Sequence, residues 1–189
     1  MKENMKMKYS IKSIQERFNA GEPMEFIFFW GHTANPGHIT KACFSQWFPC
    51  DFTVEDVHYH TTEQFMMAQK ALLFHDTETC AKIMSADNPK EYKALGRLVR
   101  DFEPQTWDDC KFDIVCRGNR AKFSQNPELG AFLLGSGNRV LVEASPYDDI
   151  WGVKLAQDDP KIQNPNNWAG QNLLGFALME TRDWLRDEK

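Results

Sequence analysis

Glu63 is the residue best placed to do chemistry, because this carboxylate stands in the first turn of a predicted helix. Thr61 or Thr62 can cap the helix, which is predicted to continue to Phe74. Free N–H groups and the helix dipole favour an ionised carboxylate there by about 0.3–1 kcal/mol. Lys70 follows on a nearby face. Two interpretations stay open: Glu63 is catalytic, or it only completes the helix start.

A second group of polar residues occupies positions 143–152, at the end of a predicted strand over 139–144. The strand ends in the carboxylate Glu143, and a proline turn then leads to Asp148 and Trp151. Loops that follow strands often display functional groups. The alternative is an Asx-type turn in which Trp151 fills the core.

Basic residues and a glycine-rich segment are candidates for contacts with phosphate. The segment 170–175 resembles the start of a helix whose backbone N–H groups could hold an anion. Four basic residues on predicted helices either line a phosphate pocket or form solvated helix faces: Arg97, Arg117, Arg120 and Lys122.

His58 and His60 carry nitrogen atoms that can bind metals, and Cys43 and Cys50 lie upstream. The paired C-x2-C spacing of common zinc sites is missing, so we expect no metal site and no cofactor. A Cys–His nucleophile is the other chemical interpretation of these residues. Buried, unreactive cysteine is the commoner arrangement.

Length and composition limit the classes of protein that remain. A chain of 189 residues fits one domain with a substantial core. Its net charge of -5 and pI near 5.6 argue against broad nucleic-acid binding, although a local basic pocket stays compatible with them. Five cysteines, an odd number, suggest a reduced, cytoplasmic protein. We expect no signal peptide and no membrane span, since the apolar run 26–30 is too short.

The elements that must position these residues predict an α+β fold, a single helix-rich domain with a small β-sheet. Strands are predicted at 25–30, 42–47, 51–59 and 139–144. Helices are predicted at 10–20, 61–74, 76–84, 89–99, 104–123, 127–134 and 171–186, with a loop over 158–168. We expect residues 1–24 to form an N-terminal extension with a short helix, and residues 25–187 to form one catalytic domain.

The order and spacing of these segments resemble the NADAR, or YbiA-like, family over most of the chain. The matching segments are 28–32, 45–49, 62–71, 96–97, Trp107, 122–123, 141–148, 151–152 and 172–179, with Arg182. The chain departs from the family at Lys154, where a second glycine is usual. Lys154 would narrow the pocket or add a positive charge to it.

The resemblance implies cleavage of an N-glycosidic bond. Family members are associated with the pyrimidine–ribose bond of phosphorylated riboflavin-pathway intermediates, or with ADP-ribose attached to guanine bases. The expected partner is therefore a small phosphorylated ribosyl substrate or an ADP-ribosylated guanine base, and the oligomeric state stays open. The functional positions carried over from the family are Glu63, Lys70, Asp148 and Trp151, with Arg97, Trp107, Lys122, Glu143 and Asn172 as further pocket members.

These residues can support a mechanism with an oxocarbenium-like transition state at the ribose. Glu63 would activate water or stabilise the cation, and Asp148 would hold ribose hydroxyls or act as the partner acid. Trp151 would stack on the base. In a variant, Lys70 with a pKa lowered by burial would attack C1 and form a Schiff base. The rival class is a non-catalytic module that binds ADP-ribose or a nucleotide.

Overall fold

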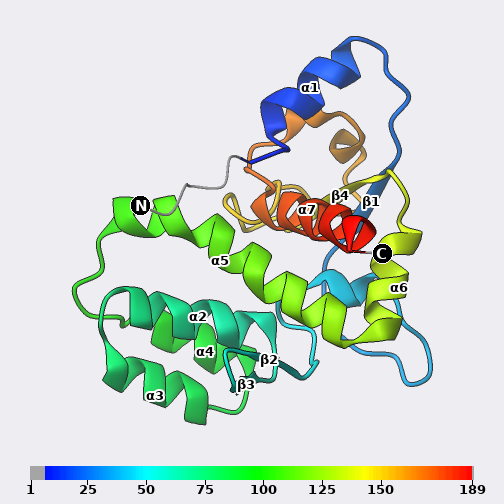
Figure 1. The fold of residues 1–189 in the computed structure, drawn as a ribbon. Coiled ribbons are helices and arrows are strands. Elements are labelled where there is room, and N and C mark those ends of the chain that lie inside the picture. Colours follow the sequence, from blue (N-terminus) through cyan, green and yellow to red (C-terminus); the bar gives the residue numbers. More distant parts are fainter. Residues whose placement is uncertain (1–6, 189) are drawn as a thin grey trace.

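The structure, a computed structural model, describes residues 7–188 as helices around two small sheets, which agrees with the predicted α+β class (Figure 1). Residues 1–6, part of the predicted N-terminal extension, lie outside the described residues. The elements are α1 (Ile11–Asn19), β1 (Phe26–Phe29), the 3-10 helix η1 (Lys41–Phe44), β2 (Phe52–Val54), β3 (Val57–Tyr59), α2 (Thr62–Leu73), α3 (Thr77–Ser85), α4 (Pro89–Gly96), α5 (Pro104–Gln125), α6 (Pro127–Gly135), β4 (Val140–Glu143), the 3-10 helices η2 (Pro160–Gln163) and η3 (Pro165–Asn167), and α7 (Leu173–Asp187).

The parallel pair β1–β4 brings distant parts of the chain together. Its register runs from Phe26 opposite Val140 to Phe29 opposite Glu143, so both strands end at the same edge. Helix α7 packs closely on β4, because a Cβ atom at Gly175 would lie 2.1 Å from the carbonyl oxygen of Leu141. This contact requires glycine and fixes the end of β4, where Glu143 stands.

The long helix α5 crosses the molecule between two groups of elements (Figure 1). Helices α2, α3 and α4 lie on one side of it, and α7 with β1 and β4 lies on the other. The start of α2 is fixed in place: the Thr61 hydroxyl caps it by accepting from the N–H of Gln64 at 3.0 Å. The N–H of Glu63 also donates to the carbonyl of Gln46 at 2.9 Å.

Two predicted elements differ from the structure. The predicted strand 42–47 is wrong: its first part is the 3-10 helix η1, whose start Thr40 caps through its side chain. This turn buries Cys43 and Phe44 completely, so their apolar side chains needed no strand pairing. The predicted strand 51–59 is the antiparallel hairpin β2–β3.

The ends of two helices also differ from the prediction, and 3-10 turns occupy part of the predicted loop. Helix α4 stops at Gly96, short of the predicted 99. Helix α7 starts at Leu173, because Asn172 adopts a left-handed conformation with φ 55°. The predicted loop 158–168 contains the short turns η2 and η3.

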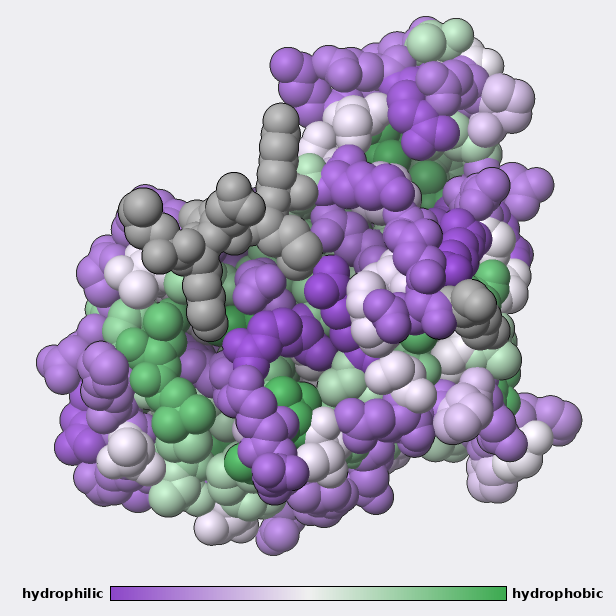
Figure 2. Space-filling view, viewed as in Figure 1, coloured by the Kyte–Doolittle hydropathy of each residue, from purple (hydrophilic) through white to green (hydrophobic). Residues whose placement is uncertain are grey.

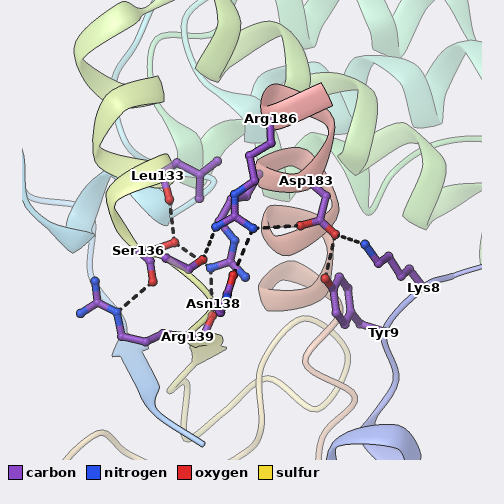
Figure 3. A network of polar contacts seen from close by, with 10 residues as sticks. Lys8, Tyr9, Leu133, Ser136, Asn138, Arg139, Asp183 and Arg186 are labelled. Carbon is purple, nitrogen blue, oxygen red and sulfur yellow. Dashed lines mark hydrogen bonds and ion pairs between the residues drawn. The ribbon is translucent and has the colours of Figure 1, made fainter. Parts of the chain in front are cut away.

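A polar network joins the segment before α1 to helix α7 (Figure 3). The Tyr9 hydroxyl donates to Asp183 at 2.7 Å, and the Lys8 ammonium pairs with the same carboxylate. One residue earlier on α7, the buried Arg182 donates to the Ser136 hydroxyl at 2.7 Å. These contacts hold α7 at both its solvent-facing and its core-facing sides.

Hydrophilic side chains cover most of the face shown in Figure 2, and hydrophobic ones gather at its lower left. Three large apolar side chains that are exposed lie at the end of α2 and between α4 and α5: Leu72, Leu98 and Phe102. Within residues 7–188, no helix has the length and apolar character needed to cross a membrane.

Candidate active site

A pocket of about 200 Å³ lies where α2, α4 and α5 meet the end of β4 and the loop after it. Seven of the residues singled out in the sequence line it: Glu63, Lys70, Arg97, Trp107, Glu143, Asp148 and Trp151. Segments that are far apart in the chain therefore converge on one space. The family resemblance implied this grouping, and the structure supplies its geometry.

One face of α2 forms a wall of the pocket. Glu63, Met66, Met67 and Lys70 all line it, at helical positions i, i+3, i+4 and i+7. Seven residues of α-helix rise about 10 Å. The carboxylate and the amine therefore stand two turns apart on one helix face, with two methionines between them.

Glu63 is buried, with 4% of its surface exposed. Burial raises its pKa to about 7, and the nearby charge of Asp148 acts in the same direction, while Lys93 opposes it. The helix dipole at this position favours the ionised form. Loss of hydration outweighs the dipole here, which corrects the expectation of an ordinary ionised carboxylate at a helix start.

Glu143 stands at the end of β4, where the strand meets α7. Its N–H donates to the side-chain oxygen of Asn172 at 2.9 Å. Burial raises the pKa of Glu143 to about 8, and the charges of Asp148 and Glu63 raise it further. Its buried Oε2 has no hydrogen-bond partner among residues 7–188. That oxygen is free to hold a proton or a substrate atom.

Asp148 lies in the loop after β4 and lines the pocket. Its Oδ1 accepts from the N–H groups of Ile150 at 2.9 Å and Trp151 at 2.7 Å. This is the Asx-type turn that was the structural alternative for the segment 143–152. The same turn carries Asp148 and Trp151 into the pocket lining, so the two interpretations hold together.

Lys70 is half-buried at the other end of the α2 face. Its Nζ donates to the carbonyl of Gly96 at 2.8 Å and lies 4.2 Å from the centre of the Phe102 ring. Burial lowers the pKa of Lys70, and the nearby Arg97 lowers it further. Both effects increase the fraction of neutral amine, the form that attacks electrophiles.

Two of the predicted pocket members, Lys122 and Asn172, do not belong to the pocket lining. Lys122 is completely buried, and its Nζ donates to the carbonyl of Ser45 at 3.0 Å. Asn172 is also buried and bridges two backbone groups of β4. Its Nδ2 donates to the carbonyl of Leu141, and its Oδ1 accepts from the N–H of Glu143. Both residues position the backbone around the site.

The remaining basic and sulfur candidates lie elsewhere. Arg117 approaches Glu55 at 3.4 Å, and Arg120 lies over the ring of Trp184. Burial raises the pKa of Cys43 to about 12 and also raises that of Cys50. Thiols held in the protonated form are poor nucleophiles, which argues against a Cys–His dyad.

The pocket also contains functional groups that sequence reasoning missed. Lys93 and Trp47 both line it. Lys93 precedes Arg97 by four positions, and that spacing places both on one side of α4. Trp47 lies inside the matching segment 45–49, although no role was assigned to it. Lys93 and Arg97 are exposed, so two positive charges lie at the solvent side of the buried acids.

Comparison with known proteins identifies the family of the chain. The NADAR domain profile matches residues 28–186, and the chain belongs to this family. N-glycosidase R617 of Acanthamoeba polyphaga mimivirus is 47% identical over 167 residues, which cover 86% of this chain and 97% of that protein. The Riboflavin biosynthesis protein VVA0006 of Vibrio vulnificus is 27% identical, over 85% of this chain and 39% of that protein.

A solved structure supports the fold. The NMR structure of the Escherichia coli protein YbiA matches with a TM-score of 0.67 and 27% identity, over 87% of this chain and 86% of that one. The YbiA-like fold expected from the sequence is confirmed.

Lys154, the departure from the family pattern, does not line the pocket, so it neither narrows nor charges it. It is exposed, approaches Asp149 at 3.9 Å, and adopts a left-handed conformation with φ 59°. That backbone conformation explains why glycine is favoured at this position.

We therefore expect Lys154→Gly to raise the free energy of unfolding slightly. Relief of left-handed strain, about 1–2 kcal/mol, exceeds the entropic cost of glycine, about 0.5–1 kcal/mol. Urea denaturation measures the change. Lys161→Gly is the control: Lys161 has no left-handed strain to relieve, so its replacement brings only the entropic cost of glycine. Equal destabilisation of both variants would contradict this account of Lys154.

The raised pKa values predict that stability falls as pH rises. Between pH 4.5, the ordinary pKa for Glu, and about 8, the folded chain holds protons on Glu63 and Glu143 that the unfolded chain has released. We expect the free energy of unfolding to fall by several kcal/mol between about pH 5 and pH 8, because each proton held only by the folded chain contributes about 1.4 kcal/mol per pH unit.

Replacing Glu143 with Gln should flatten that slope, because it removes one of the two groups that titrate with a raised pKa. Denaturation at several pH values measures the slope, and Glu128→Gln, an exposed carboxylate on α6, is the matched control. An unchanged slope in Glu143→Gln would contradict the assignment.

Proposed function

We propose that this chain is an N-glycosidase that hydrolyses a ribose C1–N bond in a phosphorylated ribosyl substrate. The observation that carries the proposal is a pair of carboxylates in one pocket with the half-buried amine of Lys70: Glu63 is buried, and the Oε2 atom of Glu143 is buried. Hydrolysis of a C–N glycosidic bond needs a proton for the departing nitrogen and stabilisation of a cationic sugar. The name of the mimiviral relative supports the same activity.

Glu143 is the acid in this proposal. With a pKa of about 8 it carries a proton at neutral pH, and its Oε2 has no partner among residues 7–188. As the C1–N bond breaks, its electron pair stays on nitrogen, and Glu143 supplies the proton. This replaces Asp148 as the partner acid, since Oδ1 of Asp148 already accepts two backbone N–H groups.

Lys70 and Glu63 complete the reaction. The lowered pKa of Lys70 increases the fraction of neutral, nucleophilic amine. In this proposal its Nζ attacks C1 and forms a Schiff base with the opened sugar. Glu63, with a pKa of about 7, accepts through water the proton released from the amine and passes it to the ring oxygen as the sugar opens. Water then adds at C1 and frees the amine, and the proton that water loses restores Glu143. The net result is free base and free sugar phosphate, with the enzyme regenerated.

The remaining lining residues bind the substrate. Trp151 and Trp107 offer flat surfaces against which a base can stack. Lys93 and Arg97 are exposed at the pocket and can bind phosphate, where arginine provides a bidentate grip and lysine a point charge. A pocket of about 200 Å³ takes the ribose and its immediate substituents.

Two phosphorylated ribosyl substrates fit this chemistry: a riboflavin-pathway ribosylamine phosphate and ADP-ribosylated guanine. Parallel assays with both, in which release of free base is measured by chromatography, test the activity and rank the substrates. Binding of either compound without release of base would show a binding module and would overturn the proposal.

The variant Glu63→Gln keeps the shape of the side chain and removes its proton transfer. We expect the rate of base release to fall about 10²–10⁴-fold, the usual contribution of general acid–base catalysis. The exposed Glu128→Gln variant should retain full activity. Near-complete activity of Glu63→Gln would rule out the proposed proton transfer.

The Schiff base predicts a covalent adduct. When borohydride is added during turnover, it should reduce the imine and leave a sugar phosphate attached to Lys70, which peptide mass spectrometry would locate. Lys70→Gln should give no adduct, whereas the exposed Lys82→Gln should trap normally. An active enzyme that yields no adduct would assign the attack to water and leave Lys70 with a binding role only.

A further inference from the structure

The hairpin β2–β3 brings together three metal-binding side chains on its outer face: Asp51, His58 and His60. The register pairs Phe52 with Tyr59 and Thr53 with His58, which continues to Asp51 opposite His60. Alternation along the strands buries Phe52 and Tyr59 in the core and leaves the other set outside. The cluster is therefore a direct consequence of strand pairing.

The ligand atoms already face one another. Nδ1 of His60 lies 2.8 Å and Nε2 of His58 lies 3.5 Å from Oδ1 of Asp51, and all three atoms lie within 4.8 Å of one another. A tetrahedral ion with ligand bonds of about 2.0–2.1 Å needs ligand atoms about 3.3 Å apart. Small rotations of exposed side chains are enough to reach that geometry.

The sequence expectation of no metal site considered only the cysteines upstream of His58 and His60. With Asp51 beside them, we propose that Asp51, His58 and His60 form a binding site for a divalent transition-metal ion of the Zn²⁺ type. Two imidazole nitrogens and one carboxylate suit zinc and its neighbours, whereas Mg²⁺ and Ca²⁺ prefer oxygen ligands. Three protein ligands leave one position open to solvent. The site is separate from the pocket, since none of the three residues lines it.

The backbone around the cluster is well anchored. The amide of Asn126, at the end of α5, donates to the carbonyl of Asp51 at 3.0 Å. The N–H of His60 donates to the side chain of Gln64 at 2.8 Å, within the first turn of α2. A bound ion joins both strands of the hairpin directly before the helix that carries Glu63, so it stabilises the hairpin and the start of α2.

Titration of the full chain, free of metal and of any histidine tag, with Zn²⁺ in a calorimeter tests the site. We expect one saturable ion per chain, a rise in Tm on binding, and no competition from Mg²⁺. The double variant His58→Gln, His60→Gln and the variant Asp51→Asn should each bind at least about tenfold more weakly. His38→Gln, an exposed histidine outside the cluster, is the matched control.

Absorption of bound Co²⁺ and amide NMR shifts locate the ion independently. Shifts confined to residues 51–64 support the proposal. It is overturned if no saturable binding occurs, if the double variant binds as the original chain does, or if the shifted amides lie at the cysteines. The ligands are exposed, so circular dichroism of the variants should match that of the original chain.

Discussion

The burial of two carboxylates in one pocket is the constraint around which the site is arranged. Glu63 and Glu143 both lose hydration, and the charge of Asp148 raises the pKa of each. The charge of Glu63 raises the pKa of Glu143 further. Two neighbouring buried acids cannot both be charged at low cost, so the site holds a proton near neutral pH. Partial compensation comes from Lys93, whose charge lowers both pKa values.

The fold supplies this arrangement through contacts that are themselves inflexible. The parallel pairing of β1 with β4 sets the end of β4, and Asn172 holds the N–H of Glu143. On the opposite wall, Gln46 receives the N–H of Glu63 and fixes the start of α2. The backbone positions of both acids are therefore set by contacts from several parts of the fold.

Most of the helices, and the helix that carries Glu63, could be predicted from the sequence, because they depend on local signals. Threonine capping and helical spacing predicted α2, and Glu63 and Lys70 on this helix line the same pocket. The segment 42–47 was predicted wrongly as a strand, because burial of its side chains is satisfied equally well by a 3-10 turn. Local pattern alone does not separate those two outcomes.

Burial was the quantity that the sequence left undetermined. The helix dipole alone predicted an ionised carboxylate at Glu63. The burial that raises its pKa depends on segments that approach from elsewhere in the chain, and the local sequence does not show them. Lys122 was placed in the pocket, yet it points to the carbonyl of Ser45, and Lys93 took no part in the sequence argument. Such outcomes depend on long-range packing, for which spacing along one helix gives no information.

The pH dependence of kcat/KM for base release tests the central claim most directly. If the site needs Glu63 ionised and Glu143 protonated, the rate should rise with an apparent pKa near 7 and fall with one near 8, which gives a narrow bell. In Glu143→Gln the alkaline limb should disappear. A profile that stays flat between about pH 6 and pH 9 would contradict the account, because no proton would then be shared between the two buried acids.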